Sequence, residues 1–190
     1  MTLNLPVEDG ANELLSRDPF ALLLAMMLDQ QVPLEKAFSS PYQLALRLGH
    51  EPTAAEVADF DPEELAALFS QRPALHRFPR AMAGRAQELA RQIVDQYDGD
   101  AARVWAGAST GQELVGRLSR LPGFGGYKAQ ITAALLGKQL GVRPEGWREA
   151  TGHFGEEGSH YSVADIVDDA SLSAVRAHKK GLKAAAKAAG

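Results

Sequence analysis

The sequence predicts an all-α fold, and three observations lead to that prediction. Alanine, leucine, glutamate, glutamine and arginine dominate the 190 residues, and all of them have high helix propensity. No segment alternates apolar and polar residues for long enough to form a half-buried strand. Helix-start signals recur, since an aspartate cap precedes a proline at Asp18-Pro19 and again at Asp61-Pro62. A chain of this length suits one compact domain or two small lobes that share a core.

The first half of the chain predicts one central helix followed by several short ones. Residues 19–31 are apolar nearly all round, so we expect this helix to be buried at the centre of the fold. Thr53 is a helix cap, and Glu56 stands at the position that completes a capping box. Prolines and caps place the short helices at residues 33–38, 41–48, 54–60 and 62–70.

The second half predicts a long amphipathic helix and then two helices joined by a glycine-rich turn. Residues 79–97 carry an apolar stripe at helical spacing, and Asp98-Gly99 ends the helix. Residues 141–160 are rich in glycine, proline and polar side chains, so they predict a loop with one helical turn near Trp147. The stripe of the long helix consists of Met82, Ala86, Leu89, Ile93 and Tyr97. The other helices are expected at residues 101–105, 110–118, 126–140 and, as one or two helices, 162–190.

Composition excludes several classes of site. The chain has no cysteine, which excludes disulfides, cysteine-ligated zinc and a thiolate-held iron–sulfur cluster, and no other transition-metal site is expected. The N-terminus lacks the layout of a signal peptide, in which positive charge precedes an apolar run. The longest apolar run, residues 20–28, is too short to span a bilayer. We therefore expect a soluble, monomeric, cytoplasmic protein with no membrane partner.

Charge is unevenly distributed along the chain. The formal net charge is −4, which argues against a nucleic-acid partner at first sight. Residues 51–64 are purely acidic among their charged positions, whereas residues 71–92 hold five arginines and one glutamate. Residues 175–187 are basic and contain no acid. Segregated charge can create a positive face on a net-negative molecule, although either basic segment alone is typical of a solvated helix face.

The turn between two expected helices, Leu121–Gly126, has the sequence "LPGFGG". Pro122 stops the preceding helix, because it has no N–H to donate. Gly123 and Gly125 leave the backbone bare and can adopt positive φ angles. The next helix begins at once, so its free N–H groups and the positive end of its dipole form an anion site that suits a phosphate. The alternative is an ordinary helix–helix turn with a glycine cap. Lys128, in the first turn of the next helix, makes this alternative less favoured.

Two segments of the sequence resemble one family. "LPGFGGYKA", residues 121–129, resembles the hairpin of the helix-hairpin-helix DNA glycosylase (HhH-GPD) superfamily, which includes endonuclease III and the alkyl- and oxo-purine glycosylases. "DPFALLLAMMLDQQVPLEKAF", residues 18–38, is similar to the early buried helix of that family and the short helix after it. The resemblance covers residues 18–140. The hairpin alone occurs in other DNA-binding proteins, and its combination with the "LDQQ" segment is considerably more specific.

The resemblance implies a fold and a mode of DNA binding. Two helical lobes would flank a central cleft, with residues 32–138 forming the lobe that carries the hairpin. Residues 1–31 and 139–190 would together form the second lobe. Gly123, Gly125, Gly126 and Lys128 would contact a phosphate of double-stranded DNA, and a sodium or potassium ion on the hairpin carbonyls would be the only bound ion. Gln30 and Gln31 would lie at the mouth of the cleft, near the gap left by an extruded base; in isolation the two glutamines are typical of a polar helix end.

The catalytic acid of the family has no clear counterpart here. The family uses an aspartate beyond the second hairpin helix to stabilise the sugar cation that forms as the base departs. Spacing places that position at Glu145, and Asp165 and Asp168 are alternatives if the loop is longer. The extra methylene of a glutamate shifts its carboxylate, and a shift of about an ångström can lower the rate by orders of magnitude. Glu145 is therefore either the catalyst or an exposed acid in an altered site.

The lysine of the bifunctional members is also displaced. Tyr127 occupies its position, and Lys128 follows one residue later. One residue rotates a helical side chain by about 100°, so Lys128 is expected to meet phosphate instead of a sugar carbon. Tyr127 is a candidate for stacking on an extruded base, although packing in the core is the more usual role of a single tyrosine.

Three functions remain open on this sequence. The first is a monofunctional DNA glycosylase of base excision repair that flips a damaged or mispaired base out of the duplex and needs no organic cofactor. The second is a catalytically degenerate, structure-specific DNA-binding protein with the same fold. The third is a helical protein-interaction module that uses the hairpin only as a turn. The first two place the protein on the nucleoid when it is bound to DNA, and salt-sensitive DNA binding separates them from the third.

Overall fold

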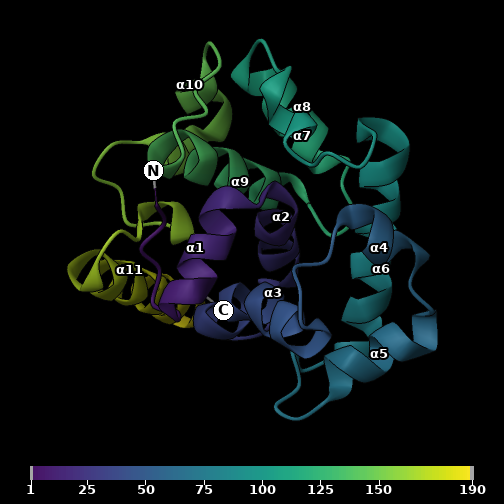
Figure 1. Ribbon diagram of the computed structural model, residues 1–190. Helices are drawn as coiled ribbons and strands as arrows, with labels where there is room; N and C mark the ends of the chain where they lie inside the picture. Colours follow the sequence, from purple (N-terminus) through teal and green to yellow (C-terminus); the bar gives the residue numbers. More distant parts are fainter. Residues whose placement is uncertain (1, 189–190) are drawn as a thin grey trace.

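The computed structural model describes residues 2–188, and all of their regular secondary structure is helical (Figure 1). The only β-type pairing among these residues is an isolated bridge between Thr110 and Glu145. The all-α prediction is confirmed. The α-helices are α1 Asp9–Arg17, α2 Pro19–Leu28, α3 Leu34–Leu48, α4 Ala54–Asp59, α5 Pro62–Ser70, α6 Pro79–Tyr97, α7 Arg103–Ala106, α8 Gly111–Ser119, α9 Gly126–Gln139, α10 Trp147–Thr151 and α11 Asp169–Ala188. Two 3-10 helices are η1 Gly152–Gly155 and η2 Val163–Asp165.

Helix α2 is the centre of the core, as expected. Every residue from Phe20 to Leu28 is buried, because α1, α3 and α6 all pack against this helix. Asp18 caps its first turn, and its Oδ1 accepts hydrogen bonds from the backbone N–H groups of Phe20 and Ala21 at 2.8 and 3.2 Å. Figure 1 shows α1, α2 and α3 together in the middle of the molecule. No helix within residues 2–188 has both the length and the apolar character needed to cross a membrane.

Helices α4 and α5 cover one side of the long helix α6. The apolar stripe predicted for α6 is buried except for Tyr97, which is half-buried. Gln87, in the same helix, is buried and donates from Nε2 to the carbonyl oxygens of Val57 and Phe60 at 3.3 and 2.6 Å. These two bonds hold α4 and the residue after it onto α6.

The two short helices expected at residues 33–38 and 41–48 form one continuous helix, α3. Proline usually breaks a helix, because it has no N–H and its ring clashes with the preceding turn. Here Pro41 is buried, and Ser40 beside it donates from Oγ to the carbonyl oxygens of Lys36 and Leu75 at 2.6 and 2.7 Å. Tertiary packing thus outweighs the local cost of the proline. Because α3 packs on α1 and α2, it joins residues of the two expected lobes; that division and the cleft between the lobes stay predictions.

Helices α8, α9 and α10 pack together and hold the glycine-rich turn. The helical turn expected near Trp147 is present as α10. Trp147 is only 8% exposed, because its ring lies against Gly137 of α9. A Cβ atom at Gly137 would approach the ring to 2.4 Å, and one at Gly111 would approach the Trp147 Cα to the same distance. Two glycines therefore make room for one tryptophan.

The contact between Gly137 and Trp147 predicts opposite effects for two Gly→Ala substitutions. Gly137→Ala should destabilise the protein by about 1–3 kcal/mol, because the added methyl group overpacks the contact with the Trp147 ring. Gly116→Ala should instead raise the free energy of unfolding by up to about 1 kcal/mol, since Gly116 lies inside α8 with open space around it. Chemical denaturation of both variants measures the two effects. Equal stability of the two variants would contradict this packing.

Candidate nucleic-acid interface

The glycine-rich turn is a tight hairpin between α8 and α9. Leu121 and Phe124 are both buried and anchor its two sides in the core. Phe124 donates its N–H to the Leu121 carbonyl oxygen at 3.0 Å, and Leu121 donates to Leu118 at 3.0 Å. The residues between and after these anchors therefore stand at the surface in a fixed backbone conformation.

The glycines of this hairpin serve two different needs. Gly123 has a φ angle of +84°, and a Cβ there would lie 2.9 Å from Met27 Cγ and 3.1 Å from Arg85 Cδ. Gly123 is therefore required by the fold itself. Gly125 has an ordinary φ of −72°, and a Cβ at Gly125 or Gly126 would meet no atom within 4 Å. The protein interior does not require glycine at these two exposed positions, so their bare backbone is available to an external molecule.

The first turn of α9 begins directly at these open glycines. α9 has 14 residues, and no side chain caps its N-terminus. By contrast, Thr110 caps α8, the other helix of the hairpin, by accepting from the Glu113 N–H at 3.1 Å. The N–H groups of Gly126, Tyr127 and Lys128 have no partner within a helix, because they belong to its first turn. Together with the positive end of the helix dipole, they form a site for an anion such as phosphate.

The end of α2 meets this hairpin. Gln30 donates from Nε2 to the Met27 carbonyl oxygen at 2.8 Å, and its Oε1 accepts from Arg85 at 3.5 Å. His76 Nδ1 accepts the N–H of Phe78 at 3.1 Å, so its Nε2 carries the proton and donates to the Gln30 carbonyl oxygen at 2.9 Å. Burial lowers the pKa of His76, which favours this neutral form. Gln30 is thereby held beside the Gly123 turn.

Gln31 adopts a different conformation from its neighbour. Its φ angle is +56°, in the left-handed region, and its side chain is exposed. The chain turns at this residue before α3 begins. The structure thus brings Gln30 to the hairpin and presents Gln31 to solvent after the end of α2.

Lys128 faces α2 and does not extend freely into solvent. Its Nζ donates to the Met27 carbonyl oxygen at 3.2 Å, and the side chain is half-buried. Burial lowers the pKa of Lys128, and the attraction of Asp29 opposes that effect. To contact a DNA phosphate as predicted, the Lys128 ammonium group would therefore have to leave the Met27 carbonyl oxygen.

Asp29 is the carboxylate that the structure brings to the hairpin. It follows the last residue of α2 and is half-buried. Burial raises its pKa, while the positive charges of Lys179 and Lys128 lower it by smaller amounts. A carboxylate that is desolvated and flanked by lysines in this way is typical of functional sites.

Tyr127 lies on the outer side of the same first turn. Its side chain is 72% exposed, so it does not pack in the core as a single tyrosine usually does. Its ring stands edge-on to Phe154 with the centroids 6.2 Å apart. Phe154 in turn contacts His153 at 4.0 Å and Tyr161 at 6.5 Å between ring centroids. A cluster of aromatic side chains, with Phe154 buried and Tyr127 exposed, therefore adjoins the hairpin.

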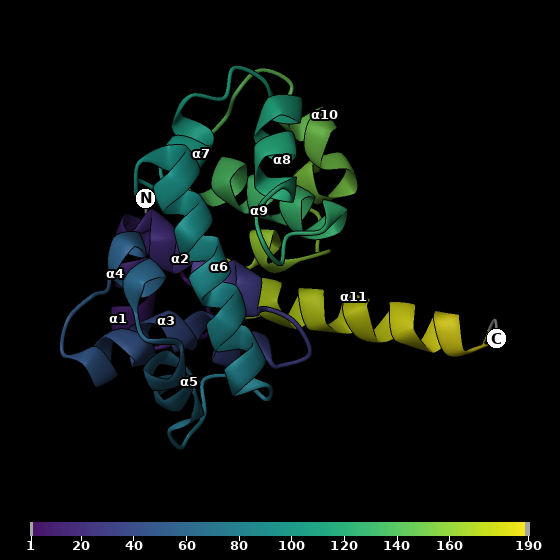
Figure 2. The ribbon, with the colours of Figure 1, turned by 90° about the vertical axis from the view of Figure 1, so that its right-hand side faces the viewer.

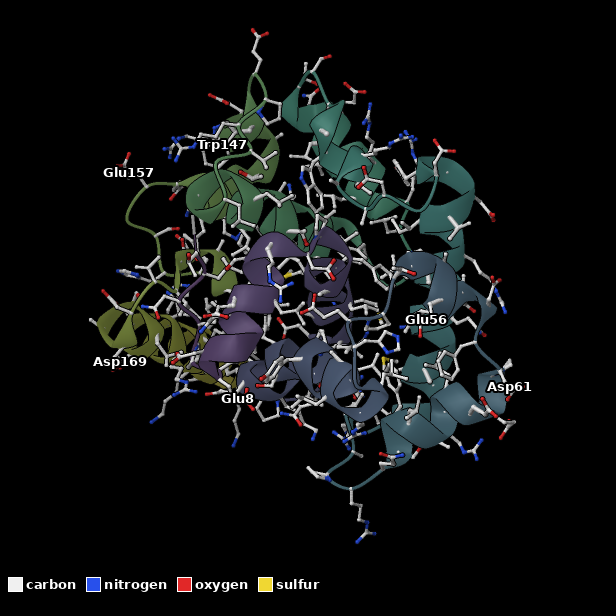
Figure 3. The ribbon with its side chains drawn as sticks, in the orientation of Figure 1. Glu8, Glu56, Asp61, Trp147, Glu157 and Asp169 are labelled. Atoms are coloured by element: carbon white, nitrogen blue, oxygen red, sulfur yellow. The ribbon has the colours of Figure 1, made fainter. Side chains whose placement is uncertain are left out.

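Glu145 does not lie beside the hairpin, contrary to the expectation from spacing. Its carbonyl oxygen accepts the N–H of Gly111 at 2.7 Å, which fixes it at the first residue of α8. The hairpin follows the last residue of α8. The nine residues of this helix are separated by eight steps of about 1.5 Å, so its two ends lie about 12 Å apart. Trp147, two residues further on, is the first residue of α10 and lies in the upper part of Figure 3. The segment that returns to the hairpin is instead the one that carries Phe154.

The two alternative acids, Asp165 and Asp168, perform structural roles. Asp165 has a buried carboxylate that forms an ion pair with Lys138 at 2.5 Å and completes the capping box with Ser162. Asp168 is exposed and accepts a hydrogen bond from the Ser171 N–H at 2.8 Å. That bond and a second one from the Ser171 hydroxyl keep the pKa of Asp168 low. Neither carboxylate lies in the group around Gln30 and Lys128.

Sequence reasoning missed two members of this group, Asp29 and Arg85. Asp29 stands inside the "LDQQ" segment, in which only the two glutamines were predicted to lie at the cleft. Arg85 is one of the five arginines in the basic segment 71–92. One signal in the sequence could have identified Asp29. An acid that directly follows a fully apolar helix lies at the edge of the core, where burial perturbs its pKa.

The raised pKa of Asp29 predicts how its replacement changes stability. A carboxyl group whose pKa is higher in the folded protein stabilises the fold only while it is protonated, and this contribution is lost as pH rises through the folded pKa. Asp29→Asn, which resembles the protonated form, should therefore be more stable than the parent at pH 7. The gain should disappear below pH ~4, near the ordinary pKa of aspartate. Denaturant unfolding at both pH values checks this. The prediction would be contradicted if the stability of the variant relative to the parent were lower at pH 7 than at pH ~3.

One of two comparisons with known proteins identifies the family of the chain. No curated protein matches the chain at a level that indicates a relationship. A family description, the HhH-GPD superfamily base excision DNA repair protein, matches residues 24–188. That range contains the end of α2, the hairpin and α11. The chain therefore belongs to the HhH-GPD superfamily of base excision DNA repair proteins.

Proposed function

We propose that this repair protein is a monofunctional DNA glycosylase, which hydrolyses the N-glycosidic bond of a damaged or mispaired base. The observation that carries the proposal is the first turn of α9. It presents an exposed tyrosine, Tyr127, and holds its lysine, Lys128, against the Met27 carbonyl next to the carboxylate of Asp29. The first turn of α9 thus supplies no freely extended amine, and the carboxylate of Asp29 next to it is desolvated.

DNA would be held at the hairpin. The open backbone at Gly125 and Gly126 and the uncapped start of α9 support a phosphate at this place. A sodium or potassium ion on the hairpin carbonyls belongs to the same proposal, since it would neutralise the phosphate beside it. Gln30 would stand at the gap left by an extruded base, and that base would stack on Tyr127.

Asp29 is our candidate for the catalytic carboxylate. In the proposed step the bond between C1′ and the base nitrogen breaks, and its electron pair leaves with the base. A water oxygen then bonds to C1′ and gives its proton to the carboxylate. The raised pKa of Asp29 suits a general base, and its negative charge would stabilise the sugar cation. The placement of Glu145 at the far end of α8 supports Asp29 over Glu145 in this role.

A second candidate function rests on the same placement. Glu145, Asp165 and Asp168 all lie outside the group at the hairpin, and their hydrogen bonds are explained by local structure. This favours a DNA-binding protein without glycosylase activity if Asp29 does not act on the sugar. DNA binding without base release would identify this second function.

The proposed phosphate site predicts that Gly125→Val weakens DNA binding without unfolding the protein. A Cβ atom at this exposed position meets no protein atom within 4 Å, and the valine side chain would keep phosphate away from the backbone N–H groups. Loss of a charged hydrogen bond is worth about 1.5–3 kcal/mol, so the dissociation constant should rise about 10-fold or more. Fluorescence anisotropy at several salt concentrations measures binding, and circular dichroism monitors folding.

A matched control for this variant is Gly84→Val. Gly84 also has open space around it. The exposed face of α6 around it carries two acids and two arginines, Glu88, Asp95, Arg80 and Arg91. Because the two acids balance the two arginines, this face carries no net positive charge, so Gly84→Val should bind like the parent. Parental affinity of a folded Gly125→Val variant would rule out the hairpin as the phosphate site.

Base release separates the two candidate functions and the two candidate acids. Oligonucleotides that carry deaminated, alkylated or oxidised bases form the substrate panel. Asp29→Asn should slow base release by about 100-fold or more while it retains DNA binding, because a neutral amide cannot stabilise the sugar cation. Glu145→Gln should keep parental activity. Activity lost in Glu145→Gln and kept in Asp29→Asn would assign catalysis to Glu145.

Borohydride trapping tests the monofunctional assignment. A lysine nucleophile forms a Schiff base with the sugar, which borohydride converts into a covalent adduct with DNA. The parent should give no adduct. An adduct that Lys128→Ala abolishes would show that Lys128 leaves the Met27 carbonyl and acts as the nucleophile, and the protein would then be bifunctional.

A further inference from the structure

Helix α11 leaves the body of the protein as a projecting rod (Figure 2). Val175 is its one fully buried residue, and every residue from Lys179 to Ala188 is exposed. The root of the helix is fixed by an ion pair between Arg176 and Glu35 and by the His178 ring, which stands 4.7 Å from that of Tyr161. The outer part of α11 therefore makes no contribution to the core.

The positive charges of α11 form one stripe. After Asp169 in its first turn, the helix contains no acid. The helix carries four lysines and one arginine. At about 100° per residue, their spacing places all five side chains within an arc of about 100°. The opposite face carries alanine and glycine, with Leu182 as the one large apolar residue exposed there. The members of the stripe are Arg176, Lys179, Lys180, Lys183 and Lys187.

The four lysines of this stripe carry unneutralised charge. Among residues 2–188, none of the four forms an ion pair with a carboxylate, whereas Arg176 does. Four positive charges that repel one another along one face destabilise an isolated helix. An anionic partner laid along the stripe would remove that repulsion.

The stripe begins at the site of the hairpin. Lys179 attracts the carboxylate of Asp29, which also attracts Lys128 in the first turn of α9. A chain of aromatic contacts joins the same two elements, from His178 through Tyr161 and Phe154 to Tyr127. An anionic polymer bound at the hairpin therefore has the stripe as its continuation.

We infer that α11 is a second DNA-binding element, whose four lysines bind the phosphates of undamaged duplex beside the site held by the hairpin. The inference rests on DNA binding by the hairpin face and extends it. From Lys179 to Lys187 the helix rises about 12 Å, which matches three to four phosphates of one strand at about 3.4 Å each. The face of small residues disfavours an anionic membrane as the partner, because helices that lie in a membrane surface present large apolar side chains. The contacts involve phosphates alone, so they carry no sequence preference.

The test removes the charge of the stripe and measures the salt dependence of DNA binding. The variant carries Lys179→Gln, Lys180→Gln, Lys183→Gln and Lys187→Gln in the full chain. Each lysine–phosphate contact contributes about 0.9 to the slope of log K against log salt, so the slope should fall by about three to four on an undamaged duplex of about 30 base pairs. On a duplex of about 10 base pairs, one helical turn, the parent and variant should differ much less.

Two controls match this variant. Lys→Arg at the same four positions keeps the charge and should keep the slope. Ala185→Gln and Ala188→Gln place the same amide on the opposite face of α11 and should also leave the slope unchanged. Circular dichroism monitors the helix in each protein.

The outcomes are separable from those of the proposed function. An unchanged slope in the four-lysine variant overturns the inference, whatever the hairpin does. Loss of binding to vesicles containing phosphatidylserine, with the DNA slope unchanged, would assign the stripe to a membrane instead. The duplex is undamaged, so the salt slope can be measured whether or not the parent releases bases. Gly125→Val should weaken binding at the hairpin and leave the stripe intact. Adding the four Lys→Gln changes to Gly125→Val should therefore lower the salt slope by as much as it does in the parent. That result would support DNA binding by α11 independently of the hairpin.

Discussion

The burial of α2 is the constraint on which the other elements depend. A helix that is apolar on every side cannot lie at a surface, so α1, α3 and α6 must cover it. The end of such a helix is then surrounded by protein at the place where its polar residues begin. Asp29 and Gln30 stand there, and the carbonyl oxygen of Met27 is left to accept the Lys128 ammonium and the Gln30 amide. The core thus determines where the polar group at the hairpin is assembled.

The sequence allowed prediction of the features that short segments encode. The central helix followed from its composition, and the hairpin followed from a proline and glycines within six residues. The position of Glu145 did not follow, because the bridge to Thr110 and the packing of Trp147 on Gly137 determine the path of the chain there. These contacts join residues that are distant in sequence. The continuous α3 was missed for a similar reason, since Pro41 is accommodated by burial.

The group at the hairpin was only partly predictable. Spacing and resemblance identified Gly123, Gly125 and Gln30. In the structure the two glycines share one turn, and Gly123 and Gln30 both lie against Arg85. The electrostatic state of Asp29 depends on burial and on lysines about 100 and 150 residues further along the chain. No local pattern reports such an environment. A motif therefore indicates where a site lies, whereas the pKa values within it depend on the whole fold.

The two classes of glycine in the hairpin have a consequence for how this protein changes over generations. Gly123 is retained by the fold, because any side chain there collides with Met27 and Arg85. Gly126 lies in the first turn of α9 with open space around it, and alanine would be tolerated there and would favour the helix. Selection for stability alone would therefore replace Gly126 and keep Gly123. Continued presence of glycine at both positions in a lineage would report that the surface is still in use, and loss of Gly126 alone would be an early sign that a descendant had abandoned it.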